Sequence, residues 1–145
     1  MIYEIRTYAI KVGTVQEYYK KFHEAFDERQ KLSRMIGIFN TEIGNLNRVM
    51  HIWEYESAGH REETRAKALN FDWWPPPIGD LLVRQTTKIV TMPPFRPEPR
   101  LGKNGNVYEV RTYTTHPSRI KDVLGIWIYS FENLVFHLIS CHFCP

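Results

Sequence analysis

The chain has 145 residues, of which 43% are hydrophobic, 24% charged and 14% aromatic, with a formal net charge of +3. This composition is typical of one soluble globular domain and excludes an intrinsically disordered chain. The charge is too small, and lysine and arginine too scattered, for a nucleic-acid-binding protein. No apolar run approaches the roughly 20 residues that a membrane span requires, so we expect no membrane span.

The first element is a strand over residues 2–10, because polar and apolar residues alternate in IYEIRTYAI and many are β-branched or aromatic. Gly13 ends it, and Thr14 with Glu17 has the spacing of a capping box. The following stretch, 15–32, carries an apolar and aromatic stripe at helical spacing, which predicts an amphipathic helix.

Two more strands are predicted at 35–43 and 48–56, joined by a turn at 44–47. Ser57 is the expected N-cap of a helix that includes 59–69, which three consecutive prolines then terminate. A fourth strand follows in LLVRQTTKIVTM. This order predicts an α+β fold, a ferredoxin-like βαββαβ module with helices on one face of a four-stranded antiparallel sheet. We assign the module to residues 1–92.

A linker rich in proline and glycine is predicted at 93–106. After it the chain repeats its own beginning: YEIRTY at 3–8 returns as YEVRTY at 108–113, with five identical residues at an offset of 105. A helical pattern follows at 117–127, and the correspondence fails from about residue 128. We interpret 107–145 as a truncated second copy of the module with a divergent tail, an internal repeat of one whole domain.

A sheet with helices on one face leaves the other face bare, and two such sheets can pair into a barrel around a cavity. We therefore expect a homodimer of the dimeric α/β barrel type. Ile5, Met50 and Ile52 are expected beneath the helices. The polar and aromatic rows of the first and third strands are then expected to line the cavity and bind a ligand: Glu4, Arg6, Tyr8, His51, Trp53 and Tyr55.

Two interpretations of these rows stay open. Glu4 and Arg6 could form an ion pair that fixes strand register, or they could contact a ligand or substrate. The barrel is expected to hold a small apolar ligand or a segment of a protein partner. His51 is the one candidate catalytic residue, because its ordinary pKa lies near neutrality. Whether the protein is an enzyme is open, and the sequence favours a non-enzymatic binding or scaffold protein. The alternative is a cofactor-independent oxygenase or isomerase, and no cofactor is expected in either case.

The tail holds His137, Cys141, His142 and Cys144 within eight residues. A lone Cys-x-x-Cys without a distant second pair is a weak zinc pattern, so we expect no metal site.

The N-terminus enters a strand at once, which favours a chain without a targeting sequence and a cytoplasmic location.

The segments YEIRTY, GIFNTEIGNLNRVMHIWEYES and HREETRAKAL resemble the NIPSNAP family in order and spacing. The resemblance covers about residues 1–92 and resumes at 107–127, and TEIGNLNRVMHIWEY is its most specific part. The family's motif positions fall here on Tyr3, Glu4, Arg6, Tyr8, Glu42, Gly44, Asn47, His51, Trp53 and Tyr55.

The resemblance implies a dimeric α/β barrel built from ferredoxin-like halves. For the animal members it also implies association with mitochondria, vesicle transport and recruitment of autophagy adaptors, with no settled catalytic mechanism. We expect this chain to depart from the family pattern in three ways: it would lack a targeting sequence, NFDWWPPPIGDLL would end the second helix early, and the second half would be incomplete.

Overall fold

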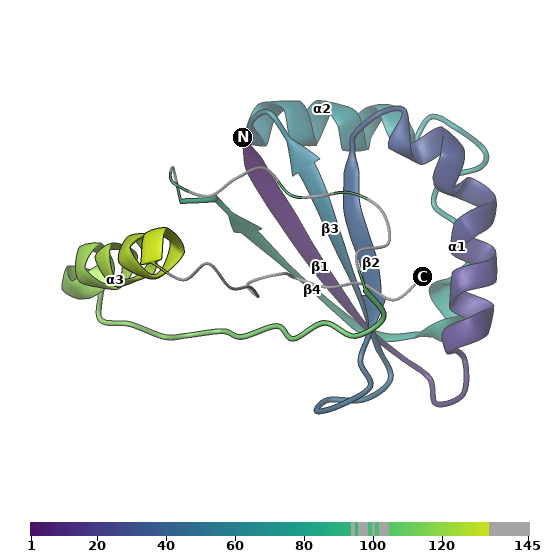
Figure 1. Ribbon diagram of the computed structural model, residues 1–145. Coiled ribbons are helices and arrows are strands. Elements are labelled where there is room, and N and C mark those ends of the chain that lie inside the picture. The colour runs from purple at the N-terminus through teal and green to yellow at the C-terminus, as the bar shows by residue number, and fades with distance from the viewer. Residues whose placement is uncertain (94, 96–98, 100, 102–104, 134–145) are drawn as a thin grey trace.

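The computed structural model describes residues 1–93, 95, 99, 101 and 105–133. The first module runs β1 (Ile2–Ile10), α1 (Val15–Gln30), β2 (Met35–Asn40), β3 (Arg48–Tyr55), α2 (Ala58–Ala68) and β4 (Leu82–Val90), with a 3-10 turn at Gly79–Leu81 (Figure 1). A second 3-10 turn at Pro117–Arg119 leads into α3 (Ile120–Asn133). The predicted βαββαβ order is confirmed, and no helix in the described part of the chain is long and apolar enough to cross a membrane.

The four strands form one antiparallel sheet in the order β2-β3-β1-β4. β1 is therefore central, and its residue Arg6 lies opposite His51 of β3 and Thr87 of β4. Opposite residues share a face of an antiparallel sheet, so this register aligns the polar rows of three strands. β1 and β3 are the two inner strands, each paired along both edges.

The helix starts follow local chemistry. Ser57 accepts a hydrogen bond from the backbone N–H of His60 at 3.1 Å, which confirms the predicted N-cap of α2. Thr14 precedes α1, but its hydroxyl donates to the carbonyl of Lys11 at 2.7 Å and makes no cap bond, so the predicted capping box is wrong. Gly13 supplies the left-handed turn there with φ of +80°.

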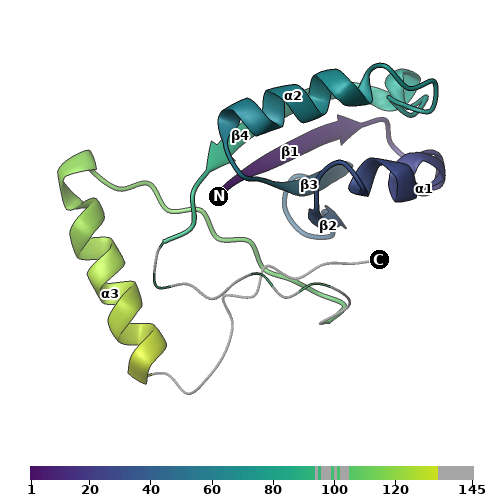
Figure 2. The same ribbon diagram turned by 90° about the horizontal axis from the view of Figure 1, so that it is seen from above.

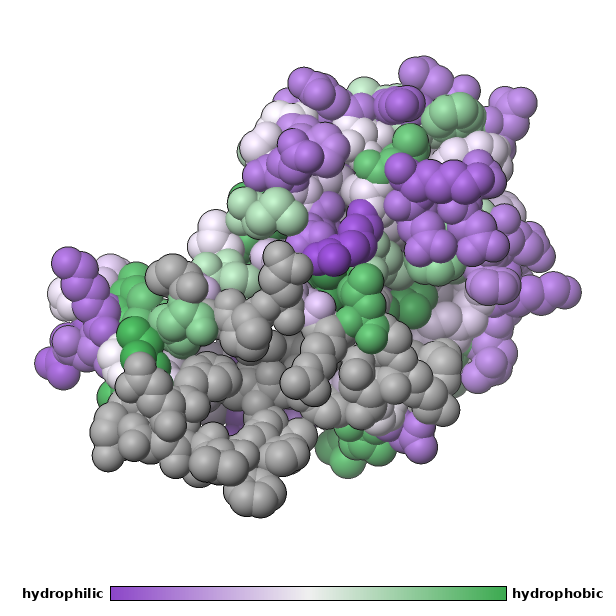
Figure 3. Space-filling view, turned by 45° about the horizontal axis from the view of Figure 1, so that its top comes forward, coloured by the Kyte–Doolittle hydropathy of each residue, from purple (hydrophilic) through white to green (hydrophobic). Residues whose placement is uncertain are grey.

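Each face of the sheet has its own apolar cluster. The cluster on the helix side joins Tyr8, Val49 and Trp53 to Tyr18 and Phe22 of α1. The cluster on the opposite, helix-free side contains Tyr3, Ile36, Phe39 and Ile52. Over the exposed side of α2, hydrophilic residues dominate the surface (Figure 3).

The second copy is not formed as a second sheet in the described residues. Residues 107–116, which repeat the sequence of β1, have no strand pairing, although the predicted helix is present as α3. Tyr108 packs against the helix-free cluster, with its ring centroid 6.0 Å from that of Phe39. Figure 2 shows this segment running on the side of the sheet opposite α2. The boundary between module and linker at residue 92 stays a prediction.

Candidate functional site

The six residues predicted to line the barrel lie on the opposite face of the sheet. Tyr8, Trp53 and Tyr55 belong to the cluster packed against α1, and His51 is in ring contact with Phe22 of α1, whereas Ile5, Met50 and Ile52 lie on the helix-free side. The facing assignment for Glu4, Arg6, Tyr8, His51, Trp53 and Tyr55 is therefore wrong. Strand alternation shows which residues share a face, but it does not show which face the helices cover.

His51 is at the centre of the aromatic core. Its Nε2 lies 3.2 Å from the hydroxyl of Tyr18, and its ring centroid is 4.4 Å from that of Phe22. Burial, together with the charge of Arg6, lowers the pKa of His51 to about 3, and burial also raises the pKa of Tyr18. His51 is thus a neutral imidazole, and its tautomer decides whether Nε2 accepts from the Tyr18 hydroxyl or donates to it.

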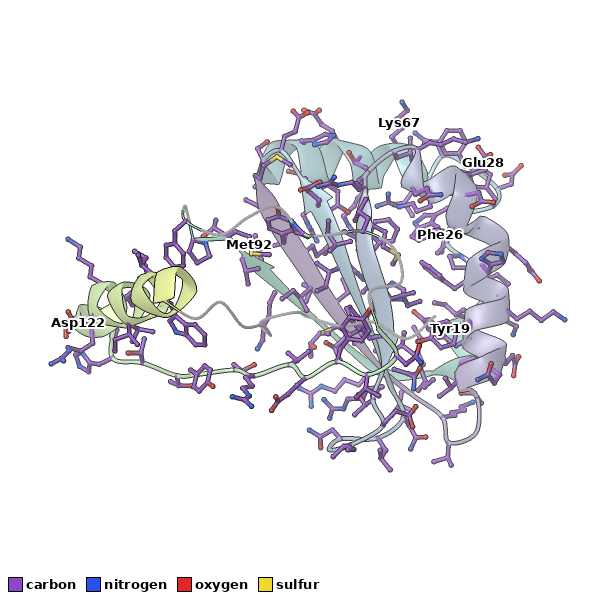
Figure 4. The ribbon with its side chains drawn as sticks, in the orientation of Figure 1. Tyr19, Phe26, Glu28, Lys67, Met92 and Asp122 are labelled. Atoms are coloured by element: carbon purple, nitrogen blue, oxygen red, sulfur yellow. The ribbon has the colours of Figure 1, made fainter. Side chains whose placement is uncertain are left out.

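A groove of about 460 Å³ runs between α1 and β2, and we call it the α1 groove. It is lined by Gln16, Tyr19, Phe22, His23, Phe26 and Ile38. Tyr19 and Phe26 project from α1 toward the sheet (Figure 4). The Tyr19 hydroxyl donates to Oδ1 of Asn40 at 3.2 Å, which fixes one wall of the groove to β2. Phe22 forms part of the lining while also touching His51, so its ring separates the groove from the imidazole.

Glu4 anchors a second, polar arrangement on the same side of the sheet. The side chain is fully buried, and it accepts hydrogen bonds from Arg6 and Thr87 at 3.0 Å and from Arg61 of α2 at 2.5 Å. Burial alone would raise the pKa of Glu4, but the hydrogen bond from Arg61 and the charge of Arg6 hold that pKa below its usual value. Glu4 is therefore ionised and ties α2 to β1, which agrees with the ion-pair interpretation of this row.

Arg29 is a buried cation in the last turn of α1, with 2% of its surface exposed. Its guanidinium stacks on Trp53 at 4.4 Å and on Trp74 at 5.2 Å from the ring centroids, and it donates to the hydroxyls of Ser33 and Tyr55. The Tyr55 hydroxyl in turn lies 3.4 Å from Oε2 of Glu4. A chain of polar contacts therefore links the end of α1 to the centre of β1.

Sequence reasoning missed the α1 groove and the role of Arg29. The signal for the groove was the width of the apolar stripe on α1, since Tyr19 and Phe26 extend it beyond what one buried face needs. Arg29 gave no signal, because an arginine near a helix C-terminus is normally exposed. No group of three metal-ligating side chains occurs among the described residues, and the cysteine-containing tail lies outside them.

Comparisons with known proteins point to one family. A family model described as NIPSNAP matches residues 3–97. NipSnap homolog 3A of Homo sapiens is 30% identical over 122 residues, which are 81% of this chain and 49% of the human protein. The NipSnap homolog of Dictyostelium discoideum is 37% identical over 73 residues, 50% of this chain and 33% of that protein. The chain spans about half the length, or less, of these two curated relatives.

Solved structures share the fold. A NIPSNAP family protein of unknown function from Agrobacterium tumefaciens has a TM-score of 0.63 and 35% identity, over 67% of this chain and 92% of that one. An uncharacterized NIPSNAP domain protein from Burkholderia xenovorans has a TM-score of 0.64 and 28% identity, over 68% of this chain and all of that one. A putative antibiotic biosynthesis monooxygenase from Nitrosomonas europaea, at 10% identity and a TM-score of 0.52, shares the fold alone.

Proposed function

This chain belongs to the NIPSNAP family, and from that premise we propose that it is a non-enzymatic binding protein whose α1 groove takes a small apolar ligand. The observation that carries the proposal is the lining of the groove, where Tyr19, Phe22 and Phe26 stand opposite Ile38. Ligand sites are commonly concave, mostly apolar and supplied with a few polar groups for orientation. Gln16 and His23 supply those polar groups here.

The walls of the groove are held in place by contacts within the chain. The Tyr19–Asn40 hydrogen bond holds its wall, and Phe22 is locked by ring contacts with Tyr18, His51 and Trp53. A preformed site loses little conformational entropy on binding, so a modest apolar contact area suffices for measurable affinity. We therefore propose this groove as the ligand site, in place of a barrel cavity lined by the six residues from β1 and β3.

Homodimerisation is the second part of the proposal. The helix-free side of the sheet carries the apolar cluster of Tyr3, Ile36, Phe39 and Ile52, and pairing with the same face of another copy would cover it. The partner would lie on the side of the sheet away from the α1 groove. Ligand binding and dimerisation are therefore expected to be separable by mutation.

The alternative function is a cofactor-independent oxygenase or isomerase that uses His51. One observation favours it: the His51–Tyr18 pair lies directly behind Phe22, which lines the α1 groove. Against it, an imidazole with a pKa of about 3 is a weak base near neutral pH. The variant His51→Phe keeps a ring and removes the hydrogen bond, so loss of any wild-type turnover in it would reject the binding-only proposal.

Two measurements test the groove. Native mass spectrometry of the purified chain reports the assembly and the mass of any co-purified ligand. Titration with the neutral dye Nile red then measures apolar binding in wild type, in Phe26→Gln and in the control Ile43→Gln, whose side chain is 91% exposed. We expect Phe26→Gln alone to weaken binding. Equal affinity in all three proteins would reject the groove as the site.

Family membership extends the proposal to mitochondria-associated or vesicle-transport processes, with a cytoplasmic location as the alternative. Fractionation of cells that express the tagged chain distinguishes these locations. Recovery only in the cytosolic fraction would contradict the mitochondrial and vesicular assignment, and would leave the ligand-binding proposal to the dye titration.

A further inference from the structure

Three arginines gather around Glu4 where α2 crosses β1. Arg6 of β1 and Arg61 of α2 contact the Glu4 carboxylate, and Nη1 of Arg65, one turn further along α2, is 4.0 Å from it. We call Arg6, Arg61 and Arg65 the arginine cluster. Glu4 is the one carboxylate within that distance of the cluster in the described part of the chain, so the group has a net charge of two positive units.

The arginine cluster has more hydrogen-bond donors than the neighbouring Glu4 carboxylate can accept. The carboxylate of Glu4 already accepts bonds from Arg6, Arg61 and Thr87. Among the described residues, Nε of Arg61 is buried without a hydrogen-bond partner, and the only ion pair of Arg65 is the long contact to Glu4. A buried donor without an acceptor costs free energy, and like charges at this spacing repel each other. Burial and the charges of Arg6 and Arg61 accordingly lower the pKa of Arg65.

The cluster is reachable from solvent beside β4. The side chains of Arg6, Arg61 and Arg65 are 15%, 24% and 38% exposed, respectively. β4 is the edge strand farthest from α1 (Figure 1), and three of its residues on the helix side are exposed: Gln85, Thr87 and Ile89. Gln85 accepts a hydrogen bond from Nη2 of Arg6 at 3.0 Å, so this open strip is continuous with the cluster.

We propose that the arginine cluster binds the phosphate group of a phosphate monoester whose organic portion lies along Ile89, which is opposite Glu4 on β4. The charge of such a group, about −1.5 to −2 at pH 7, matches the excess of the cluster. Guanidinium groups bind phosphate oxygens in a bidentate manner, and Arg65, with 38% of its side chain exposed and only a 4.0 Å contact to Glu4, presents such a guanidinium. Ile89, which is 47% exposed, offers apolar contact beside the cluster.

The proposal predicts different affinities for three small anions. Calorimetric titration at low salt with phenyl phosphate, inorganic phosphate and benzoate compares a monoester with an aromatic body, the bare anion and a carboxylate of the same body. We expect phenyl phosphate to bind most tightly, inorganic phosphate more weakly, and benzoate weakest, with affinity falling as salt is added. Benzoate binding as tightly as phenyl phosphate would overturn the assignment to phosphate, and absence of millimolar binding by either phosphate would overturn the site.

The informative variant is Arg65→Gln, because Arg65 contributes least to holding Glu4. We expect it to weaken phenyl phosphate binding about tenfold or more, with an unchanged melting temperature. The matched control is Arg84→Gln, which removes an arginine from the opposite face of β4. Equal loss in both variants, or loss in neither, would overturn the proposal. Phe26→Gln in the α1 groove should leave phosphate binding intact, so this site and the apolar groove are tested independently.

Discussion

The two copies of the YExRTY sequence have opposite fates in this molecule. In β1, Glu4 is fully buried, and Arg6 is bonded to it at 3.0 Å and to the hydroxyl of Tyr8 at 2.7 Å. In the repeat, Arg111 lies 2.7 Å from Glu109, and the two side chains are 63% and 68% exposed. The same local ion pair therefore forms in both places.

What differs is the surroundings. β1 is flanked by β3 and β4, and Arg61 and Thr87 complete the shell of Glu4. The repeat has no strand pairing among the described residues. Hydrogen bonding to Arg111 lowers the pKa of Glu109, whereas the pKa of Glu4 is lowered against the opposing effect of burial. An extended chain suffices for the pair, but a strand requires neighbours.

The largest expected difference in stability between the two copies lies in the helices that follow them. At the offset of 105, Phe22 of α1 corresponds to Trp127 of α3. Phe22 is 3% exposed and touches His51, Trp53 and Trp74, so Phe22→Ala should cost about 4 kcal/mol through cavity formation. Trp127 contacts Tyr113 and is half-buried, so Trp127→Ala should cost about 1 kcal/mol or less.

Urea unfolding of both variants, followed by far-ultraviolet circular dichroism, measures the two costs. Similar costs would mean that α3 is packed as firmly as α1, and the contrast between the copies would fail.

The next test removes the carboxylates. Glu4→Gln leaves Arg61 and Arg6 without their counter-charge in a buried position, so we expect a loss of about 3 kcal/mol of unfolding free energy. Glu109→Gln should leave the unfolding free energy unchanged, since solvent screens its pair with Arg111. Chemical denaturation of the two variants side by side checks this. A stable Glu4→Gln protein would show that the arginines are neutralised in another way.

Much of the fold was predictable from the sequence, because strand alternation, the helical stripes and the Ser57 cap are local signals. The face of the sheet that the helices cover was not predictable, for a physical reason. Glu4 and Arg6 have the composition of a surface row, but their mutual pairing and the contribution of Arg61 from α2 make their burial possible. That third partner is 57 residues away along the chain.

The candidate site could likewise be predicted only in part from the sequence. His51 could be singled out by its residue type, but its low pKa depends on burial beneath Phe22, which tertiary packing decides. The α1 groove requires the distance between α1 and β2, and the arginine cluster requires the position of α2 over β1. Each is formed by elements whose relative position no single segment encodes.

A smaller effect is expected from pH. The pKa of Glu4 lies below its usual 4.5 in the folded chain, so its ionised form contributes stability that is fully present above the unfolded pKa. That contribution is lost as the pH falls through the folded pKa. The stability difference between wild type and Glu4→Gln should therefore narrow on acidification below about pH 4.5.

Denaturation at a series of pH values measures this narrowing, with Glu109→Gln as the control whose unfolding free energy should match that of wild type at every pH. A gap between wild type and Glu4→Gln that widens toward acid would mean that Glu4 is protonated in the folded chain.

The smallest effect concerns the packing of Tyr108, in the repeat, against the module. Tyr108 packs against Phe39 on the helix-free side, so Tyr108→Ala should cost about 0.5–1 kcal/mol. Because it uncovers part of the face proposed for homodimerisation, the same variant should raise the dimer fraction in sedimentation velocity at equal concentration. Tyr113→Ala, at a site 62% exposed, is the control and should change neither quantity. A fall in the dimer fraction of Tyr108→Ala would instead place Tyr108 within the dimer contact, and the second copy of β1 would then contribute to assembly without becoming a strand.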